Sequence, residues 1–228
     1  MLVYPNYLTL SLLFDKLSTI TKRSKMARNK SESHQIVLKA AKQEFLEKGF
    51  EGASIRSIGK RAGMTSAALY RHAKDKEDLF NQLVEPFVNE FMRRCFLHEK
   101  QSYDTINNNN GLPDFNDNEI VIIMDMSEKF HNEMKLIFCK SKGTKYETFL
   151  HEFIELQQTE MEKVLAYLET KGHKVKKISA KELHVFLSSY TTAIMEPIVH
   201  DYAKEETKEC LLKMQDFFTP GWMNIMGY

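Results

Sequence analysis

Proline, glycine and cysteine are scarce in this chain of 228 residues, which contains five Pro, nine Gly, three Cys and one Trp. So few helix breakers, together with plentiful Leu, Lys, Glu and Met, favour an all-α protein. The cysteines, Cys95, Cys139 and Cys210, are far apart and form no C-x-x-C pair. We therefore expect reduced thiols in a cytoplasmic protein and no disulfide framework.

Arrangements that carry catalysis or bind metal ions are also missing. The sequence has no paired carboxylates, no nucleophile–base arrangement and no glycine-rich phosphate loop. His131, His151 and His184 lie on three different stretches and lack a metal-ligand spacing such as H-x-x-x-H. The sequence therefore predicts neither an enzyme nor a bound cofactor or metal ion.

Long hydrophobic runs are absent as well. The most apolar stretch, Tyr7–Leu17, is interrupted by Asp15 and Lys16, well short of the ~20 residues that a membrane span needs. The same region lacks the basic head and the small-residue cleavage site of a signal peptide. We expect no association with a membrane.

Charge is distributed unevenly along the chain. Residues 1–80 contain 15 Lys and Arg against 8 Asp and Glu, which gives +7, whereas residues 81–228 contain 17 against 23, which gives −6. A basic end joined to an acidic remainder is typical of a protein that binds nucleic acid through one domain and is controlled through another.

The stretch Ser54–Phe80 predicts two short helices, a sharp turn between them and the start of a third helix. Ser54 can cap the first helix, and Gly63 can end it in the left-handed conformation that glycine adopts without steric cost. Thr65 or Ser66 can cap the second helix. Gly59 stands where the two helices approach closely, so the stretch has the small residues that a helix-turn-helix requires.

Several segments between Ser33 and Phe80 resemble the DNA-binding domain of TetR-type transcriptional regulators. The matching segments are Phe45–Phe50, Ala53–Ile58, Ala62–Thr65, Leu69–His72 and Asp75–Leu79. Two residues depart from the family pattern, since Gly59 replaces a usual Ala and Ala73 replaces a usual Phe. Met26 is followed by a segment that looks like an ordinary start for this family. We therefore expect translation to begin at Met26 and residues 1–25 to be an extension that is not native or is disordered.

The resemblance implies a helix-turn-helix DNA-binding domain of three helices at residues 26–80, with the motif at 54–73, and a larger helical regulatory and dimerisation domain at 81–228. On double-stranded DNA, the second short helix is expected to enter the major groove with its N-terminal residues at the base edges. The residues expected nearest the bases are Thr65, Ser66, Ala67 and Ala68, with Tyr70 and Arg71 within reach. Ser54, Tyr70 and Lys76 match family positions that hold the phosphate backbone.

Beyond the motif, apolar periodicity predicts a helix from Asp75 to about Glu99 and further helices at 119–140, 145–168, 179–202 and 205–218. Aromatic and thiol side chains on these helices are candidates for lining a pocket for a small-molecule effector: Phe91, Cys95, Phe130, Phe138, Phe153, Tyr167 and Tyr190. For any single one of them, ordinary core packing is the more common role. The resemblance places a homodimer interface on the last two helices.

The combined interpretation is a homodimeric, ligand-responsive DNA-binding regulator, most often a repressor in this family, that reads a palindromic operator. One alternative is a helical sensor or adaptor that acts through protein contacts without specific DNA binding, since Ala73 and the apolar second helix are compatible with that role. A helical enzyme is a third alternative, with no motif in its favour.

Overall fold

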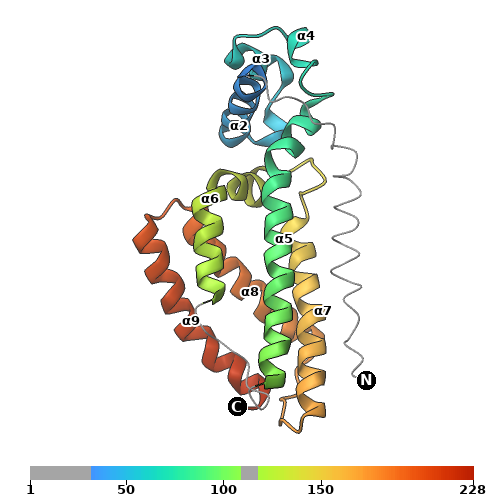
Figure 1. Cartoon of the computed structure of the whole chain (residues 1–228), viewed down its shortest axis with the longest axis vertical. Coiled ribbons are helices and arrows are strands. Elements are labelled where there is room, and N and C mark those ends of the chain that lie inside the picture. Colours follow the sequence, from blue (N-terminus) through green and yellow to red (C-terminus); the bar gives the residue numbers. More distant parts are fainter. Residues whose placement is uncertain (1–31, 109–117) are drawn as a thin grey trace. The chain divides into compact units, whose positions relative to one another are not determined.

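The computed structural model describes residues 32–108 and 118–228, which form eight α-helices and no β-strand (Figure 1). The helices are α2 (Glu32–Gly52), α3 (Ile55–Ala62), α4 (Ser66–Leu69), α5 (Lys76–Asn108), α6 (Asn118–Lys140), α7 (Phe149–Thr170), α8 (Ala180–Val199) and α9 (Lys204–Met226). The predicted all-α class is confirmed. The predictions made for residues 1–25 and for a start at Met26 lie outside the described residues.

Contacts divide the described residues into two compact units. The N-terminal unit contains residues 32–91 and 130–149, and the C-terminal unit contains residues 92–108, 118–129 and 150–228. The division falls inside α5 after Phe91 and inside α6 before Phe130, whose φ of −130° and ψ of 26° interrupt the helix. The predicted division into residues 26–80 and 81–228 stays a prediction.

The first short helix of the motif begins and ends at the predicted residues, and the third helix begins at its predicted cap. The Ser54 Oγ accepts the Ser57 N–H at 3.1 Å, and the Ser57 Oγ accepts the Ser54 N–H at 3.1 Å, which is a reciprocal capping box at the start of α3. Gly63 ends α3 in the left-handed region with φ of 67°. The Asp75 Oδ1 accepts the Asp78 N–H at 2.7 Å at the start of α5. Local capping therefore sets these boundaries.

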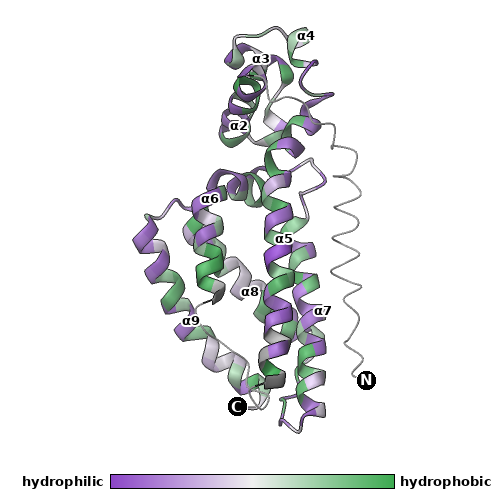
Figure 2. Cartoon of the chain, in the orientation of Figure 1, coloured by the Kyte–Doolittle hydropathy of each residue, from purple (hydrophilic) through white to green (hydrophobic). Residues whose placement is uncertain are grey.

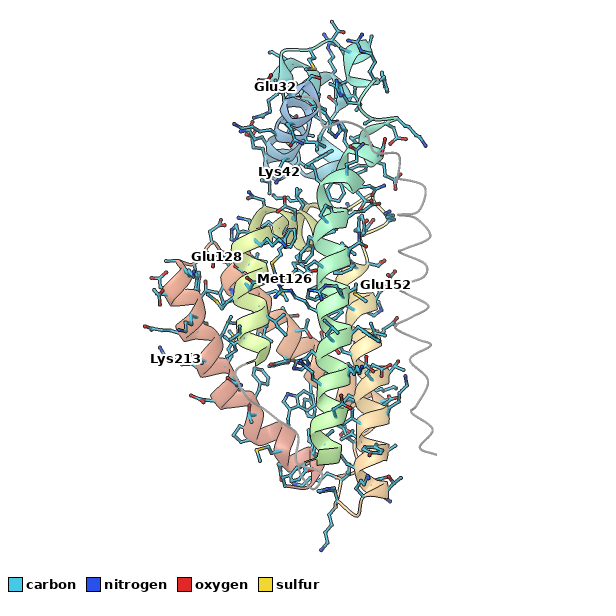
Figure 3. All side chains as sticks on the ribbon, viewed as in Figure 1. Glu32, Lys42, Met126, Glu128, Glu152 and Lys213 are labelled. Atoms are coloured by element: carbon cyan, nitrogen blue, oxygen red, sulfur yellow. The ribbon has the colours of Figure 1, made fainter. Side chains whose placement is uncertain are left out.

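The core of the N-terminal unit is aromatic. Phe45, Phe50 and Phe80 contact one another with ring centroids between 5.2 and 5.9 Å apart. An ion pair on the surface of the same unit joins Lys42 of α2, labelled in Figure 3, to Glu133 of α6. The rings hold α2 and the first turns of α5 together, and these helices support the motif.

Two hydrophobic clusters form the core of the C-terminal unit. One contains Ile106, Leu165, Leu168 and Met226, and the other contains Ile154, Leu183, Leu187 and Trp222. Hydrophobic and hydrophilic residues are interspersed along these helices (Figure 2), as expected when each helix buries one face. None of the described helices is both long enough and apolar enough to cross a membrane.

Several helix boundaries differ from the prediction. Helix α5 continues to Asn108, past the predicted end near Glu99. Helix α7 begins at Phe149 and not at Lys145, because residues 141–148 form turns in which the Thr144 Oγ1 donates to the Ser141 carbonyl at 2.6 Å. Helix α9 continues past the predicted end at residue 218 to Met226, through Pro220. Burial of Trp222 and Met226 in the two clusters stabilises this last part of the helix against the hydrogen bond that proline removes.

Candidate nucleic-acid interface

Helices α3 and α4 pass very close to each other at Gly59. The Met64 N–H donates to the Gly59 carbonyl at 2.8 Å. A Cβ atom at Gly59 would lie 2.9 Å from the Met64 carbonyl oxygen and 3.0 Å from the Leu69 Cδ1. The absence of a side chain at this position therefore permits the tight turn that presents α4.

Helix α4 directs a short row of small residues outward. The Thr65 Oγ1 accepts the Ala68 N–H at 3.2 Å and caps the helix, so Thr65 and not Ser66 has the predicted capping role. Thr65 and Ala67 are exposed, while Ser66 and Ala68 are half-buried. Buried Leu69 anchors the helix to the core. The helix ends at this residue, although the motif predicted from the sequence continues to residue 73.

Two larger side chains follow α4 directly. Tyr70 is 57 % exposed, and Arg71 is also exposed. Both follow the helix in a turn, where the Arg71 N–H donates to the Ala68 carbonyl at 3.3 Å. The structure therefore brings six of the predicted contact residues, 65–68, 70 and 71, together on one outward-facing segment.

An open groove of about 510 Å³ lies between α3 and α4. Hydroxyl groups and cations dominate its lining, which consists of Ser54, Arg56, Ser57, Lys60, Met64, Thr65 and Ser66. The Ser54 and Ser57 hydroxyls bond to each other at 2.8 Å, so this wall is held in place. Such a lining suits a polyanion.

Arg56 and Lys60 are the groove residues that the sequence analysis did not select. Both are exposed and lie four residues apart on α3, so their side chains share one face of the helix. Ile58 and Gly59 occupy the buried face. The sequence did contain a signal for these two residues. Their spacing from the buried Ile58 places both cations on the side of the helix that faces away from the core.

Lys76 has a structural role in this arrangement. Its Nζ donates to the Phe50 carbonyl at 2.6 Å and to the Ala53 carbonyl at 3.0 Å, and it lies 4.2 Å from the centroid of the Phe50 ring. Two of the three ammonium donors are thus used to hold the segment between α2 and α3. A phosphate contact by Lys76 stays a prediction.

Arg61 also binds within the protein. Its guanidinium donates to the Glu44 Oε2 at 3.0 Å through Nη2, and to the Glu47 Oε1 at 2.9 Å through Nη1. Glu44 is only 1 % exposed, and Lys48 donates to its other oxygen at 2.7 Å. This carboxylate clamp fixes α3 against α2.

The protein environment lowers the pKa of Glu44. Burial alone would raise the pKa, but hydrogen bonds from Lys48, Ser57 and Arg61 to the carboxylate outweigh that effect. The carboxylate is therefore charged at neutral pH, which strengthens the clamp.

The predicted effector-pocket residues are divided between the two units. Phe91, Phe130 and Phe138 lie in the N-terminal unit, where the Phe87 ring contacts all three at centroid distances of 5.6, 5.9 and 6.2 Å. Cys95, Phe153, Tyr167 and Tyr190 lie in the C-terminal unit. There the Tyr190 ring packs on Phe218 at 5.1 Å, and Lys171 lies 5.2 Å from the Tyr167 ring. Their role in effector binding stays a prediction.

Comparison with known protein families identifies the motif. A sequence profile described as "Bacterial regulatory proteins, tetR family" matches residues 37–83, which contain α3, α4 and the capped start of α5. Residues 37–83 are thus similar to the DNA-binding region of TetR-family proteins. The description of this profile names regulatory proteins, which agrees with the expectation that the chain is not an enzyme.

Curated relatives match the chain over stretches of very different length. The HTH-type transcriptional regulator AcrR of Shigella flexneri is 41% identical over 54 residues, which are 24% of this chain and 25% of that protein. The match thus spans about a quarter of the length of that relative. The HTH-type transcriptional repressor AcnR of Corynebacterium efficiens is 22% identical over 196 residues, 78% of this chain and 88% of the relative.

A solved structure also matches the chain. It is MexZ, described as a key repressor responsible for antibiotic resistance in Pseudomonas aeruginosa. It has a TM-score of 0.46 and 15% identity over 85% of this chain and 94% of its own.

Proposed function

We propose that this TetR-family protein is a DNA-binding transcriptional regulator that acts as a homodimeric, ligand-responsive repressor in the cytoplasm. The observation that supports DNA binding most directly is the groove between α3 and α4. It combines two exposed cations, Arg56 and Lys60, with hydroxyls at the starts of both helices. Hydroxyls, cations and helix N-termini are the groups that bind phosphate oxygens in protein–DNA interfaces.

In this proposal, α4 enters the major groove with Thr65, Ser66 and Ala67 closest to the bases. Ala67 offers only apolar contact, for example to a thymine methyl group, and Arg71 offers a bidentate grip on guanine. Ser54, Arg56 and Lys60 on the other wall contact the phosphate backbone. Arg61 takes no part, because Glu44 and Glu47 already bind it.

The exposed apolar surface of α8 and α9 supports dimerisation. Phe217 is 78 % exposed, Val185 is 58 % exposed and Phe186 is 44 % exposed. Large apolar side chains grouped on two helices mark an interaction site, and two copies of this face form a four-helix bundle in the proposal. A two-fold dimer carries two copies of α4, so it would read a palindromic operator.

An effector would control the regulator by its different affinity for two states of the dimer. One state holds the two α4 helices at a spacing that matches successive major grooves, and the other does not. A coupling free energy of ~1–3 kcal/mol changes operator affinity by roughly 5–150-fold. The candidate lining residues are Phe91, Cys95, Phe130, Phe138, Phe153, Tyr167 and Tyr190.

Selection of duplexes from a random pool, followed by affinity measurements at several salt concentrations, tests DNA binding. We expect an enriched palindrome. Arg56→Gln and Lys60→Gln are each expected to weaken binding about tenfold and to reduce the slope of log affinity against log salt by about 1, because each removes one phosphate contact. Tyr70→Ala is expected to weaken binding as well.

Lys181→Gln on α8 is the matched control, since it removes an exposed cation outside the groove. It should leave both the affinity and the salt slope unchanged. Unchanged binding in the two groove variants and in Tyr70→Ala, or a failure to enrich any sequence, would contradict the proposed interface and favour an adaptor acting through protein contacts.

Sedimentation velocity tests the proposed dimer. Phe217→Glu replaces the most exposed large apolar side chain of α8 and α9 by a charge and is expected to weaken self-association at least tenfold. Val121→Glu on α6 is the control, because Val121 is 61 % exposed and lies outside α8 and α9. A dimer that persists in the Phe217→Glu variant and dissociates in the control would show that α8 and α9 are not the interface.

A further inference from the structure

Two histidine side chains that are far apart in the sequence meet near the starts of α7 and α8, within the C-terminal unit. His151 lies in the first turn of α7, and His184 lies near the start of α8. Their rings are edge-to-face, with centroids 5.9 Å apart. Neither residue belongs to the proposed DNA-binding groove, to the candidate effector-lining residues or to the exposed apolar side chains of α8 and α9.

A hydrogen-bond network fixes which nitrogen of His184 carries the proton. The Gln158 amide nitrogen donates to the Glu162 Oε1 at 3.0 Å and to the Ala180 carbonyl at 3.2 Å, which fixes the orientation of the amide group. The Gln158 amide oxygen lies 3.2 Å from the His184 Nδ1. An amide oxygen only accepts, so Nδ1 carries the proton and the Nε2 of the neutral ring keeps a lone pair.

His151 has a similar arrangement with the two nitrogens exchanged. Its Nε2 lies 3.2 Å from the Oε1 of Glu155, one turn further along α7. A carboxylate oxygen accepts, so Nε2 carries the proton and the Nδ1 of the neutral ring keeps the lone pair. No described residue donates a hydrogen bond to the lone pair of either ring. Each imidazole therefore has one nitrogen held by a partner and one open nitrogen, as histidines that bind metal ions do.

The spacing of the two rings suits one shared metal ion. Two imidazoles on a tetrahedral ion, each with a metal–nitrogen distance of about 2.0–2.1 Å, place their ring centroids roughly 5 Å apart. The side chain of His151 is 61% exposed, so it can rotate toward His184, and water can complete the coordination. The described residues contain no group of three or more His, Cys, Asp or Glu placed to hold a metal ion, so the two imidazoles would be the protein ligands.

We propose that His151 and His184 together bind one divalent transition-metal ion of the Ni²⁺ and Zn²⁺ type, which bridges α7 and α8. Imidazole nitrogen suits these ions, whereas Mg²⁺ and Ca²⁺ bind oxygen ligands. The spacing of the histidines along the sequence predicted no metal ion, because a pair shared by two helices has no characteristic spacing. The site belongs to the C-terminal unit and goes beyond the proposed DNA binding.

Calorimetric titration of the full-length, chelator-treated protein with Ni²⁺ tests the site. Ni²⁺ is the probe because thiolates select Zn²⁺ more readily, and the chain contains three cysteines. His151→Gln and His184→Gln are each expected to weaken binding by about tenfold or more, because each leaves a single imidazole ligand. Mg²⁺ should not bind at this site.

His200→Gln at the end of α8 is the matched control. His200 and His151 have the same side-chain exposure of 61%, and the His200 Nε2 lies 3.0 Å from the Oε2 of Glu196, also one turn away. His200 is not part of the histidine pair, so this variant should bind Ni²⁺ like the unmodified protein. Binding that is unchanged in His151→Gln or in His184→Gln, or that falls equally in His200→Gln, would overturn the proposal.

Hydrogen exchange of α7 and α8 tests whether the ion bridges the two helices. Ligand binding to the closed state slows opening in proportion to the ligand concentration relative to its Kd. At free Ni²⁺ of about a hundred times Kd, opening that separates the first turns of α7 and α8 should be slowed up to about 100-fold in the unmodified protein. The same Ni²⁺ concentration should have little effect on His184→Gln. Bound Ni²⁺ without added protection of these turns would show that the ion does not join the helices and would contradict the bridge.

Discussion

Replacing Glu44 by glutamine is expected to lower the free energy of opening of the contact between α2 and α3 by about 2 kcal/mol at neutral pH. The Glu44 carboxylate accepts from Lys48 and Arg61, and hydrogen bonds to charged groups contribute ~1.5–3 kcal/mol each. We take the lower part of that range because Lys48 and Arg61 remain partly in water. The side-chain amide of glutamine also carries an NH2 group. This donor would face Lys48 or Arg61, which are themselves donors. Native-state hydrogen exchange of α3 measures the change.

Glu47→Gln is the matched control for this prediction. Both glutamates lie on α2 and bind the same guanidinium, but the side chain of Glu47 is 56% exposed and that of Glu44 is 2% exposed. The control should change the opening free energy by less than about 0.5 kcal/mol, because exposed ion pairs contribute little. Equal effects of the two variants would contradict the role of burial in the clamp.

The Glu44 variant should also differ from the unmodified protein in its response to acid. The folded-state pKa of Glu44 lies below 4.5, so its stabilisation is present above that pH and is lost as the pH falls through the folded value. The unmodified protein should therefore lose α3 protection on acidification more steeply than Glu44→Gln. Parallel acid profiles would show that the clamp does not depend on the charge of Glu44.

Replacing Gly59 by valine is expected to destabilise the helix-turn-helix by about 2–3 kcal/mol. Even a Cβ atom at this position would lie 2.9 Å from the Met64 carbonyl oxygen, which belongs to the backbone and cannot rotate away. Forcing extra atoms into a packed contact costs ~1–3 kcal/mol, and the branched side chain adds further atoms at the same place. The measurement is hydrogen exchange of α3 and α4, and operator binding should fall with it.

Gly221→Val in α9 is the control, because no atom lies within 4 Å of the Cβ position there. Valine has a better helix propensity than glycine, so this variant should be neutral or slightly stabilising. If α3 and α4 of Gly59→Val exchanged hydrogen as slowly as in the unmodified protein, the result would show that the backbone at Met64 can move away from residue 59 without a loss of stability.

The sequence by itself determined the elements that depend on neighbouring residues. Ser54 and Gly63 specify the ends of α3 because their caps bond to groups within one helical turn. Thr65 and Asp75 specify the starts of α4 and α5 in the same way. These interactions hold whatever the rest of the chain does, and for this reason the motif and most of its outward-facing residues were predictable.

Tertiary contacts decided which of the similar residues are free to bind DNA. Arg56 and Arg61 belong to the same helix, but only Arg61 meets Glu44 and Glu47, which come from α2. Lys76 likewise bonds to the carbonyls of Phe50 and Ala53, more than twenty residues earlier. Periodicity shows which face of a helix is polar, but it does not show which distant partner neutralises a charge on that face.

The end of α9 illustrates the same limit for the fold. Pro220 and Gly221 predict a helix end near residue 218, because both residues disfavour a helix interior. The helix nevertheless continues to Met226, since Trp222 and Met226 pack against residues of α7 and α8. Local sequence thus determined where helices can begin and end, whereas burial against distant helices decided where α9 ends and which cations stay exposed. The reason is that hydrophobic burial and ion pairing depend on residues that only the folded chain brings together.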